Sequence, residues 1–428
     1  MTMLMANPMD KQVNASASTK PVPVILGGEN GALPIVRSLA KIGLRSIVAS
    51  EHADDLTFKS RYCTEAVVLR EFDPSTDQEN VRILADLSQR LGVKPVLLWS
   101  SDREVLFLSR NQAELAQWYR FIMCEPSLTE QIVDKAKFSL LADAKDLPVP
   151  KTIFFYSREE ILNRLGSLPL PCIIKPVYMK DWYTPYIKLR YGSYKHALHR
   201  LRTQEEVRDF VKDLPNIERG IVVQEFIEGR DEQICSFHGY FDEAAEPVAA
   251  FVGRKIRTSP PGFGGSAFIE TMHDPEFLNL GIDICRRIGF KGVVKIDFKK
   301  HPVTDKYIIL EFNPRFTLWN YLGAFAGLNI PAMWYNDLTG RKVQPSTAYE
   351  PGRRWVCVRA DLRALPAYLK SREWTLWQWL RSYAAPKVYH TWAWDDPWPF
   401  AFVLPRFVAR RRKKRELKRG AQVASAAV

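Results

Sequence analysis

Long apolar runs and paired cysteines are missing from this 428-residue sequence, and each absence excludes a class of protein. No uninterrupted apolar stretch reaches the roughly 18 to 20 residues that a membrane-spanning helix needs. The six cysteines are far apart and form no C-x-x-C pair, which argues against a zinc ribbon or a disulfide framework and fits a reducing compartment. Residues 1–20 lack the apolar core of a signal peptide. We therefore expect a cytoplasmic protein.

Several functional signatures are missing as well. The seven histidines form no H-x-x-x-H pair, and no G-x-S-x-G elbow marks a serine hydrolase. The glycine-rich segment at residues 27–31 reads GGENG, which departs from the dinucleotide fingerprint G-x-G-x-x-G. A tight strand-to-helix turn, a cofactor site and a site for another small ligand all stay open for this segment.

Basic residues are abundant but unevenly distributed. The formal net charge is +13, yet residues 406–419 hold nine basic residues and one acid, which leaves only +5 for the other 414 residues. A nucleic-acid-binding protein would be basic over its main body, so we do not expect nucleic acid as a partner. With 46% hydrophobic and 25% charged residues, the composition is that of an ordinary globular protein.

The order of apolar patterns predicts four regions. Residues 1–20 are polar and read as a flexible leader. Residues 21–125 open with a strand, a glycine-rich turn, a helix and a second strand, which is typical of a Rossmann-like parallel sheet covered by helices. Strands and helices alternate over residues 126–345, and residues 346–428 form a C-terminal extension. The predicted fold class is therefore α/β for the first domain and α+β for the second.

Four short segments in a fixed order carry the main functional signal. They are DKAKFSLL at 134–141, CIIKP at 172–176, VVQEFIEGRD at 222–231, and VKIDFK at 294–299 paired with ILEFNPR at 309–315. In this order they resemble the ATP-grasp superfamily, and within it the predicted ATP-dependent carboligases, in the neighbourhood of the carboxylate–amine ligases. The resemblance covers about residues 22 to 340. It implies a Rossmann-like pre-ATP-grasp domain followed by a two-lobed ATP-grasp module.

The resemblance implies ATP binding, and the motifs contain residues that suit it. Lysine ammonium groups suit phosphate oxygens, and Gln224 offers an acceptor for the adenine amino group. The backbone of Glu225 and Ile227 would meet the edge of the ring, and Asp231 would accept from the ribose hydroxyls. The implied nucleotide contacts are Lys137, Lys175, Gln224, Glu225, Phe226, Ile227 and Asp231.

The fourth segment implies a metal site. Asp297 and Glu311 lie on two strands of a predicted hairpin, and Asn313 points to the same face as Glu311. Oxygen ligands of this kind suit Mg²⁺, with Mn²⁺ as an alternative cation. Arg315 would then reach the transferred phosphoryl group. Ordinary surface carboxylates on a solvated hairpin are the alternative.

Residues 254–266 are basic and enter a turn rich in proline and glycine. We predict a loop that closes over phosphate oxygens, with Lys255 and Arg257 as catalytic residues beside Arg315. An exposed basic turn is the alternative. Residues 177–194 form an aromatic and basic insert where many superfamily members have a compact glycine-rich loop. This insert either shapes the substrate pocket or packs on the core as a flap.

The predicted function is an ATP-dependent ligase that joins a carboxylate to an amine, or a similar nucleophile, through an acyl phosphate. Small-molecule substrates would contact Glu29, Asn30 and Asp102, which lie at turns after predicted strands, where open α/β sheets bind ligands. A nucleotide-binding regulatory or scaffold protein and a kinase of a small substrate are the alternatives. The predicted lysines, acids and arginine are all present, which argues against the scaffold.

The C-terminal extension carries an aromatic and basic signal of its own. Seven of the twelve tryptophans lie in residues 351–428, and the basic stretch follows them. Aromatic residues beside a cluster of arginine and lysine are typical of a segment that binds an anionic lipid surface. We predict peripheral attachment to the cytoplasmic face of a membrane. An aromatic subdomain with a solvated basic tail is the alternative.

Overall fold

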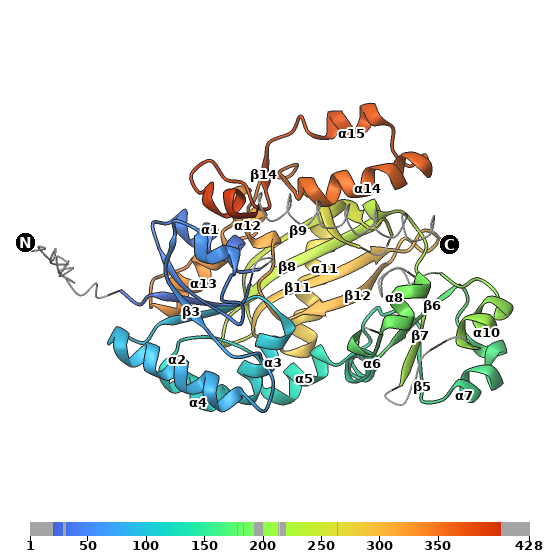
Figure 1. Ribbon diagram of the computed structural model, residues 1–428, viewed down its shortest axis with the longest axis horizontal. Coiled ribbons are helices and arrows are strands. Elements are labelled where there is room, and N and C mark those ends of the chain that lie inside the picture. The colour runs from blue at the N-terminus through green and yellow to red at the C-terminus, as the bar shows by residue number, and fades with distance from the viewer. Residues whose placement is uncertain are drawn as a thin grey trace, which may run out of the picture.

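The computed structural model describes residues 20–28, 31–177, 179–182, 184–191, 200–212, 214, 220–262 and 264–403. Three sheets organise this part of the chain. Figure 1 shows the largest sheet in the centre, with the N-terminal region at its left and a smaller, green lobe at its right. None of the helices in these ranges is both long and apolar enough to cross a membrane.

The N-terminal region is built on a parallel sheet in the strand order β3-β2-β1-β4. Its strands are β1 (Pro23–Leu26), β2 (Ser46–Ser50), β3 (Cys63–Val68) and β4 (Val96–Trp99). Its helices are α1 (Ala32–Ala40), η1 (Leu56–Lys59), α2 (Asp77–Leu91), α3 (Asp102–Arg110) and α4 (Gln112–Trp118). Strands β1, β2 and β4 are buried at every residue, as continuous apolar runs in a covered parallel sheet predict.

A capping box fixes the turn between β4 and α3. The Ser101 side chain accepts a hydrogen bond from the N–H of Glu104, and the Glu104 carboxylate accepts from the N–H groups of Ser100 and Ser101. Burial raises the pKa of Glu104. Asp102 occupies the first position of α3, so this box also fixes the backbone that carries it.

The smaller lobe contains an antiparallel sheet in the order β5-β7-β6. Its strands are β5 (Thr152–Phe155), β6 (Cys172–Pro176) and β7 (Ile221–Glu225). The helices before and around it are α5 (Pro126–Val133), α6 (Lys135–Ala144), α7 (Arg158–Asn163), η2 (Leu165–Ser167), η3 (Met179–Trp182), α8 (Pro185–Tyr191) and α10 (Gln204–Lys212). Phe155, Ile174 and Val223 belong to the core of this lobe. Strand alternation places Lys175 and Gln224 on the opposite face.

The large sheet has the order β12-β11-β8-β9-β10-β13-β14. Its strands are β8 (Ile234–Phe241), β9 (Pro247–Ser259), β10 (Gly265–Thr271), β11 (Gly292–Lys300), β12 (Tyr307–Asn313), β13 (Arg354–Val356) and β14 (Lys387–Tyr389). The accompanying helices are η4 (Asp231–Gln233), α11 (Pro275–Ile288), α12 (Trp319–Phe325), α13 (Ile330–Leu338), α14 (Val358–Lys370) and α15 (Leu376–Ser382). Strands β13 and β14 come from the C-terminal extension, so the extension shares this sheet.

The structure corrects the loop predicted at residues 254–266. β9 continues to Ser259 and β10 begins at Gly265, so only a short turn separates them. Lys255 and Arg257 therefore lie on a strand. The strand extends this far because Ile256 and Thr258 are buried there together with Arg257.

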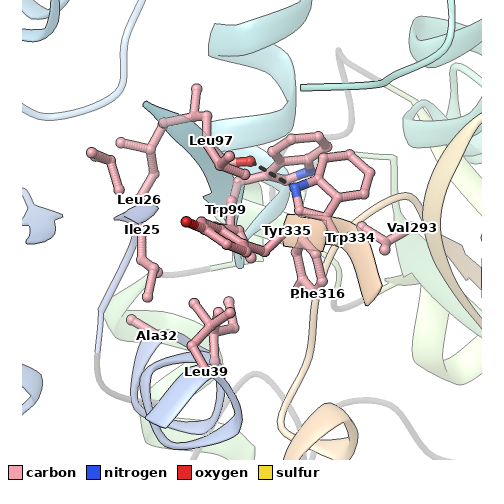
Figure 2. Packing of buried hydrophobic residues seen from close by; sticks show 14 of the residues in the cluster. Ile25, Leu26, Ala32, Leu39, Leu97, Trp99, Val293, Phe316, Trp334 and Tyr335 are labelled. Carbon is pink, nitrogen blue, oxygen red and sulfur yellow. Dashed lines mark hydrogen bonds between the residues drawn. The ribbon is translucent and has the colours of Figure 1, made fainter. Parts of the chain in front are cut away.

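One hydrophobic core joins the N-terminal sheet to α13. Trp99 and Trp334 meet edge to face, with ring centroids 5.5 Å apart, and Phe316 packs against both (Figure 2). The Trp334 indole N–H donates to the carbonyl of Leu97 over 3.2 Å, and the Trp99 indole N–H donates to Pro314 over 3.0 Å. These contacts fix β12 and the chain after it, which includes Arg315, against the N-terminal region.

Candidate functional site

Asp297 is the centre of a charged cluster on one face of the large sheet. It lies on β11, directly opposite Glu311 of β12 and Ser236 of β8. The Ser236 hydroxyl donates to the buried Asp297 carboxylate, and the ammonium groups of Lys295 and Lys255 approach it to 2.7 Å and 3.3 Å. Burial alone would raise the pKa of Asp297, but these lysines and the hydrogen bonds hold it well below the usual range. Asp297 is therefore ionised and compensated by two cations.

Lys175 faces this cluster from the smaller lobe. Its ammonium group donates to the Gln224 side-chain oxygen over 2.8 Å, and the Gln224 amide group donates to Thr152 over 2.9 Å. Burial and the charge of Lys135 lower the pKa of Lys175 to about 8, while Glu311 opposes them. The electrostatic influence of Glu311 means that the two lobes bring a lysine and a carboxylate near each other.

Arg315 connects the large sheet to the N-terminal region. Its guanidinium pairs with Asp102 over 2.6 Å, donates to the Ser100 carbonyl over 3.3 Å, and donates to the Asn313 amide oxygen over 2.9 Å. The Arg315 side chain is about one-fifth exposed and that of Asp102 half exposed. The structure thus brings together a predicted catalytic residue and a predicted substrate contact.

Two predicted roles do not agree with the geometry. Asp231, predicted to accept from ribose, is buried and accepts from Thr258, Tyr368 and the Gly262 N–H. Arg257, predicted to contact phosphate, is fully buried and forms a bidentate ion pair with Asp361 of α14, at 2.6 and 3.0 Å. Both residues are committed to partners inside the protein, so we assign them a structural role.

The other predicted nucleotide contacts lie near the smaller sheet or lead into it. Lys137 is exposed on α6 and pairs with Glu130. The N–H groups of Glu225 and Phe226 donate to Lys151 and Pro171, so they serve the sheet rather than an adenine ring. Ile227 is buried. Glu29 and Asn30 lie outside the described residues.

Sequence reasoning missed four residues of the site. Lys135 is two positions before Lys137 and influences Lys175 directly, and Ser236 donates to Asp297. Lys295 and Lys299 stand two positions on either side of Asp297, so the period of two in VKIDFK could have placed them on its face. Burial lowers the pKa of Lys299, whose ammonium lies 5.2 Å from the Phe226 ring. The sequence contains no comparable signal for Ser236.

The donor set can be compared with what a magnesium ion requires. No group of three or more His, Cys, Asp or Glu gathers as a metal site in the part of the chain that the structure describes. Mg²⁺ commonly takes one or two carboxylates and completes its shell with water and phosphate oxygens. Asp297 and Glu311, opposed across two strands, fit that smaller requirement. The Asn313 amide oxygen is already used by Arg315, which leaves it a secondary candidate.

The chain has the fold of solved ligases and carboxylases, in agreement with the resemblance that the four motifs indicate. An L-amino acid ligase from Bacillus licheniformis has a TM-score of 0.54 at 15% identity, with 75% of each chain covered. The biotin carboxylase domain of a Hydrogenobacter thermophilus 2-oxoglutarate carboxylase, solved with MgADP, ADP and bicarbonate, has a TM-score of 0.56 at 13% identity. That comparison covers 77% of this chain and 72% of the other.

Among proteins of known activity, the chain is similar to a D-aspartate ligase of Enterococcus faecium. The two are 22% identical over 364 residues, which is 81% of this chain and 84% of the ligase. No family model matches the chain. The resemblance to ATP-grasp ligases is therefore confirmed along most of the sequence and does not depend on the four short motifs alone.

Proposed function

We propose that the chain is an ATP-dependent ligase that joins a carboxylate to an amine. The observation that carries this proposal is the charged cluster around Asp297, with Glu311 opposite, Lys175 facing it and Arg315 at its edge. Cations fixed beside carboxylates suit a reaction in which phosphate charge is moved and neutralised. The similarity to enzymes named as ligases supports the same reaction class.

In the proposed reaction, a substrate carboxylate oxygen attacks the γ-phosphorus of ATP, and the bond to ADP breaks. The amine then attacks the acyl carbon, loses a proton, and inorganic phosphate leaves. Lys175 and Lys255 would hold phosphate oxygens, and Arg315 would hold the acyl phosphate. Asp297 and Glu311 would hold Mg²⁺, which supplies charge neutralisation at the phosphates. None of these residues needs to form a covalent bond with substrate.

The test is ADP release by the full chain in the presence of pools of carboxylates and amines, D- and L-amino acids included. We expect release to require both substrates and to yield free phosphate, and Glu311→Gln to lower the rate on the order of a hundredfold. Asp305→Asn, an exposed acid in the turn of the same hairpin, is the matched control and should keep the wild-type rate.

Each alternative has its own result in this assay. Phosphate that stays on the product would identify a kinase of a small substrate. ATP binding without turnover in every pool would favour a regulatory or scaffold protein. Full magnesium-dependent turnover in both Glu311→Gln and Asp297→Asn would remove the proposed cation site.

The proposal includes contact between the basic stretch at residues 406–419 and an anionic membrane surface. These residues lie outside the described part of the chain. Their sequence supports the proposal through charge alone, because nine basic residues accompany a single acid.

A further inference from the structure

Helix α14 packs beside β9 and presents three different faces. Asp361, Ala364 and Tyr368 form its buried face. At about 100° per residue, a second stripe runs alongside that face, and all of its members are apolar and at least partly exposed. This stripe consists of Val358, Leu362, Leu365 and Leu369. Leu362 is 50% exposed, and because its apolar neighbours in the stripe are at least partly exposed as well, the stripe is a patch and not a single exposed leucine.

Helix α15 adds a second apolar face next to α14. Trp379 points inward, and its indole N–H donates to Asp361 over 2.8 Å, which fixes α15 against α14. Leu376, Trp377 and Leu380 lie on the other side of this short helix, where Trp377 is 72% and Leu380 51% exposed. We call the two stripes together the α14–α15 surface, which comprises Val358, Leu362, Leu365, Leu369, Leu376, Trp377 and Leu380.

Basic side chains border this surface. Arg359, Arg363 and Lys370 fall on a third stripe of α14, next to the apolar one, and all three are exposed. Arg372 precedes α15 and Arg381 lies on it, and both are exposed. Only two acids occur in residues 358–381, and Asp361 is buried in its pair with Arg257, so the exposed charge around the surface is strongly positive.

We propose that the α14–α15 surface inserts into the interface of an anionic membrane. An interfacial helix needs apolar side chains that enter the lipid, tryptophan at headgroup depth, and basic residues that meet anionic headgroups, and this surface has all three. The described chain continues from α15 through β14 to residue 403, and Trp394 and Trp398 are exposed in that segment. The basic residues 406–419 follow it directly in the sequence.

A second copy of the chain fits this surface less well than a membrane does. In a two-fold dimer the same patch meets itself, so the basic stripes of the two copies would lie close together and repel. Nucleic acid would satisfy the arginines and lysines, but it would leave Leu362, Trp377 and Leu380 without an apolar partner. An anionic bilayer satisfies both parts of the surface.

The experiment is flotation of the full chain with phosphatidylcholine vesicles that do or do not contain phosphatidylglycerol. We expect binding to the anionic vesicles that weakens with salt, and a loss of at least about tenfold in the partition coefficient for the double variant Trp377→Ser, Leu380→Ser. Val68→Ser combined with Val303→Ser replaces two exposed apolar side chains elsewhere and should bind as the wild type does.

A tail variant separates this surface from the basic stretch that follows it. With Arg410, Arg411 and Arg412 changed to glutamine in the full chain, binding should fall but should still depend on Trp377. Equal binding by the wild type and by Trp377→Ser, Leu380→Ser would overturn the proposal, as would no vesicle binding by the wild type. A wild-type dimer that this double variant dissociates in light scattering would assign the surface to a second copy instead. Matching thermal unfolding of the variants shows that the fold is retained.

Discussion

The partly buried ammonium group of Lys175 donates a hydrogen bond to Gln224, and Lys135 and Glu311 are its charged neighbours. Burial and the like charge of Lys135 destabilise the protonated form, which lowers its pKa to about 8. A bound phosphate would act in the opposite direction, because a negative charge stabilises the ammonium. A nucleotide phosphate bound beside Lys175 would therefore offset the free energy that burial of its ammonium charge costs.

We predict that ATP binding weakens as pH rises through about 8, because Lys175 of the free protein loses its proton there. Above that pH, the Kd should rise by up to about tenfold per unit if this one group must be protonated. Calorimetric titration with ATP across this range measures the slope. Lys175→Arg should remove most of it, since a guanidinium stays protonated, whereas Lys137→Arg, at an exposed lysine, should keep it.

The lowered pKa of Lys175 also determines the direction in which the stability of the fold changes with pH. Between pH about 8 and the ordinary value of 10.5, the unfolded chain holds a proton that folded Lys175 has lost, so this group makes the folded state more stable as pH rises. Lys175→Arg should lose that contribution in urea unfolding. An unchanged pH slope of ATP binding in Lys175→Arg would contradict the assignment of the titrating group.

The sequence predicts the position of some site residues correctly and that of others wrongly, and β11 and β9 show the difference. A period of two in VKIDFK correctly places Asp297 on a strand, and the same period contains Lys295 and Lys299, which composition alone did not single out. The turn around Pro260 and Gly262 suggested that Arg257 belongs to a loop. In the structure α14 covers Arg257 with Asp361, which is 104 residues later in the chain. The residues next to Arg257 in the sequence cannot indicate a partner that lies so far along the chain.

Helix α14 holds the β9–β10 turn through one tyrosine. The buried Tyr368 hydroxyl donates to Asp231 and accepts from the Thr258 N–H over 2.8 Å, while Asp231 accepts from the Gly262 N–H over 3.1 Å. Burial and the negative charge of Asp231 raise the pKa of Tyr368, so it stays a donor. The C-terminal extension thus fixes the turn that connects two strands of the large sheet.

We predict that Tyr368→Phe destabilises the chain by about 1–3 kcal/mol, because the Thr258 N–H loses its acceptor in a buried place. If the turn contributes to nucleotide binding, the KM for ATP should rise several-fold as well. Tyr335→Phe removes a comparable tyrosine bond, to the Pro21 carbonyl at 2.7 Å, on the far side of the core. This control should lose stability without changing the KM, and an equal rise in both variants would count against a role of the turn.

At the scale of the whole molecule, the chain around Asp396 packs against the N-terminal region. Asp396 is buried and accepts from Arg37 of α1 over 3.1 Å, from Ser60 over 2.8 Å and from the Arg61 N–H over 2.9 Å. Arg37 also donates to the carbonyl of Thr391. The sequence predicts the ATP-grasp class from its motifs, yet these links join residues more than 330 positions apart and contain no local pattern.

Asp396→Ala should therefore destabilise the chain by about 3–5 kcal/mol, because it leaves the buried Arg37 guanidinium without its counter-charge. The neighbouring Asp395→Ala is the matched control: Asp395 is exposed and its carboxylate accepts a hydrogen bond from the Tyr62 hydroxyl, so its removal should cost less than about 1 kcal/mol. Guanidinium unfolding followed by tryptophan fluorescence measures both.

Because the link spans the two ends of the fold, Asp396→Ala should also separate the N-terminal region into an earlier unfolding transition. A single transition with wild-type midpoint would show that the shared core around Trp99 and Trp334 couples the regions without it.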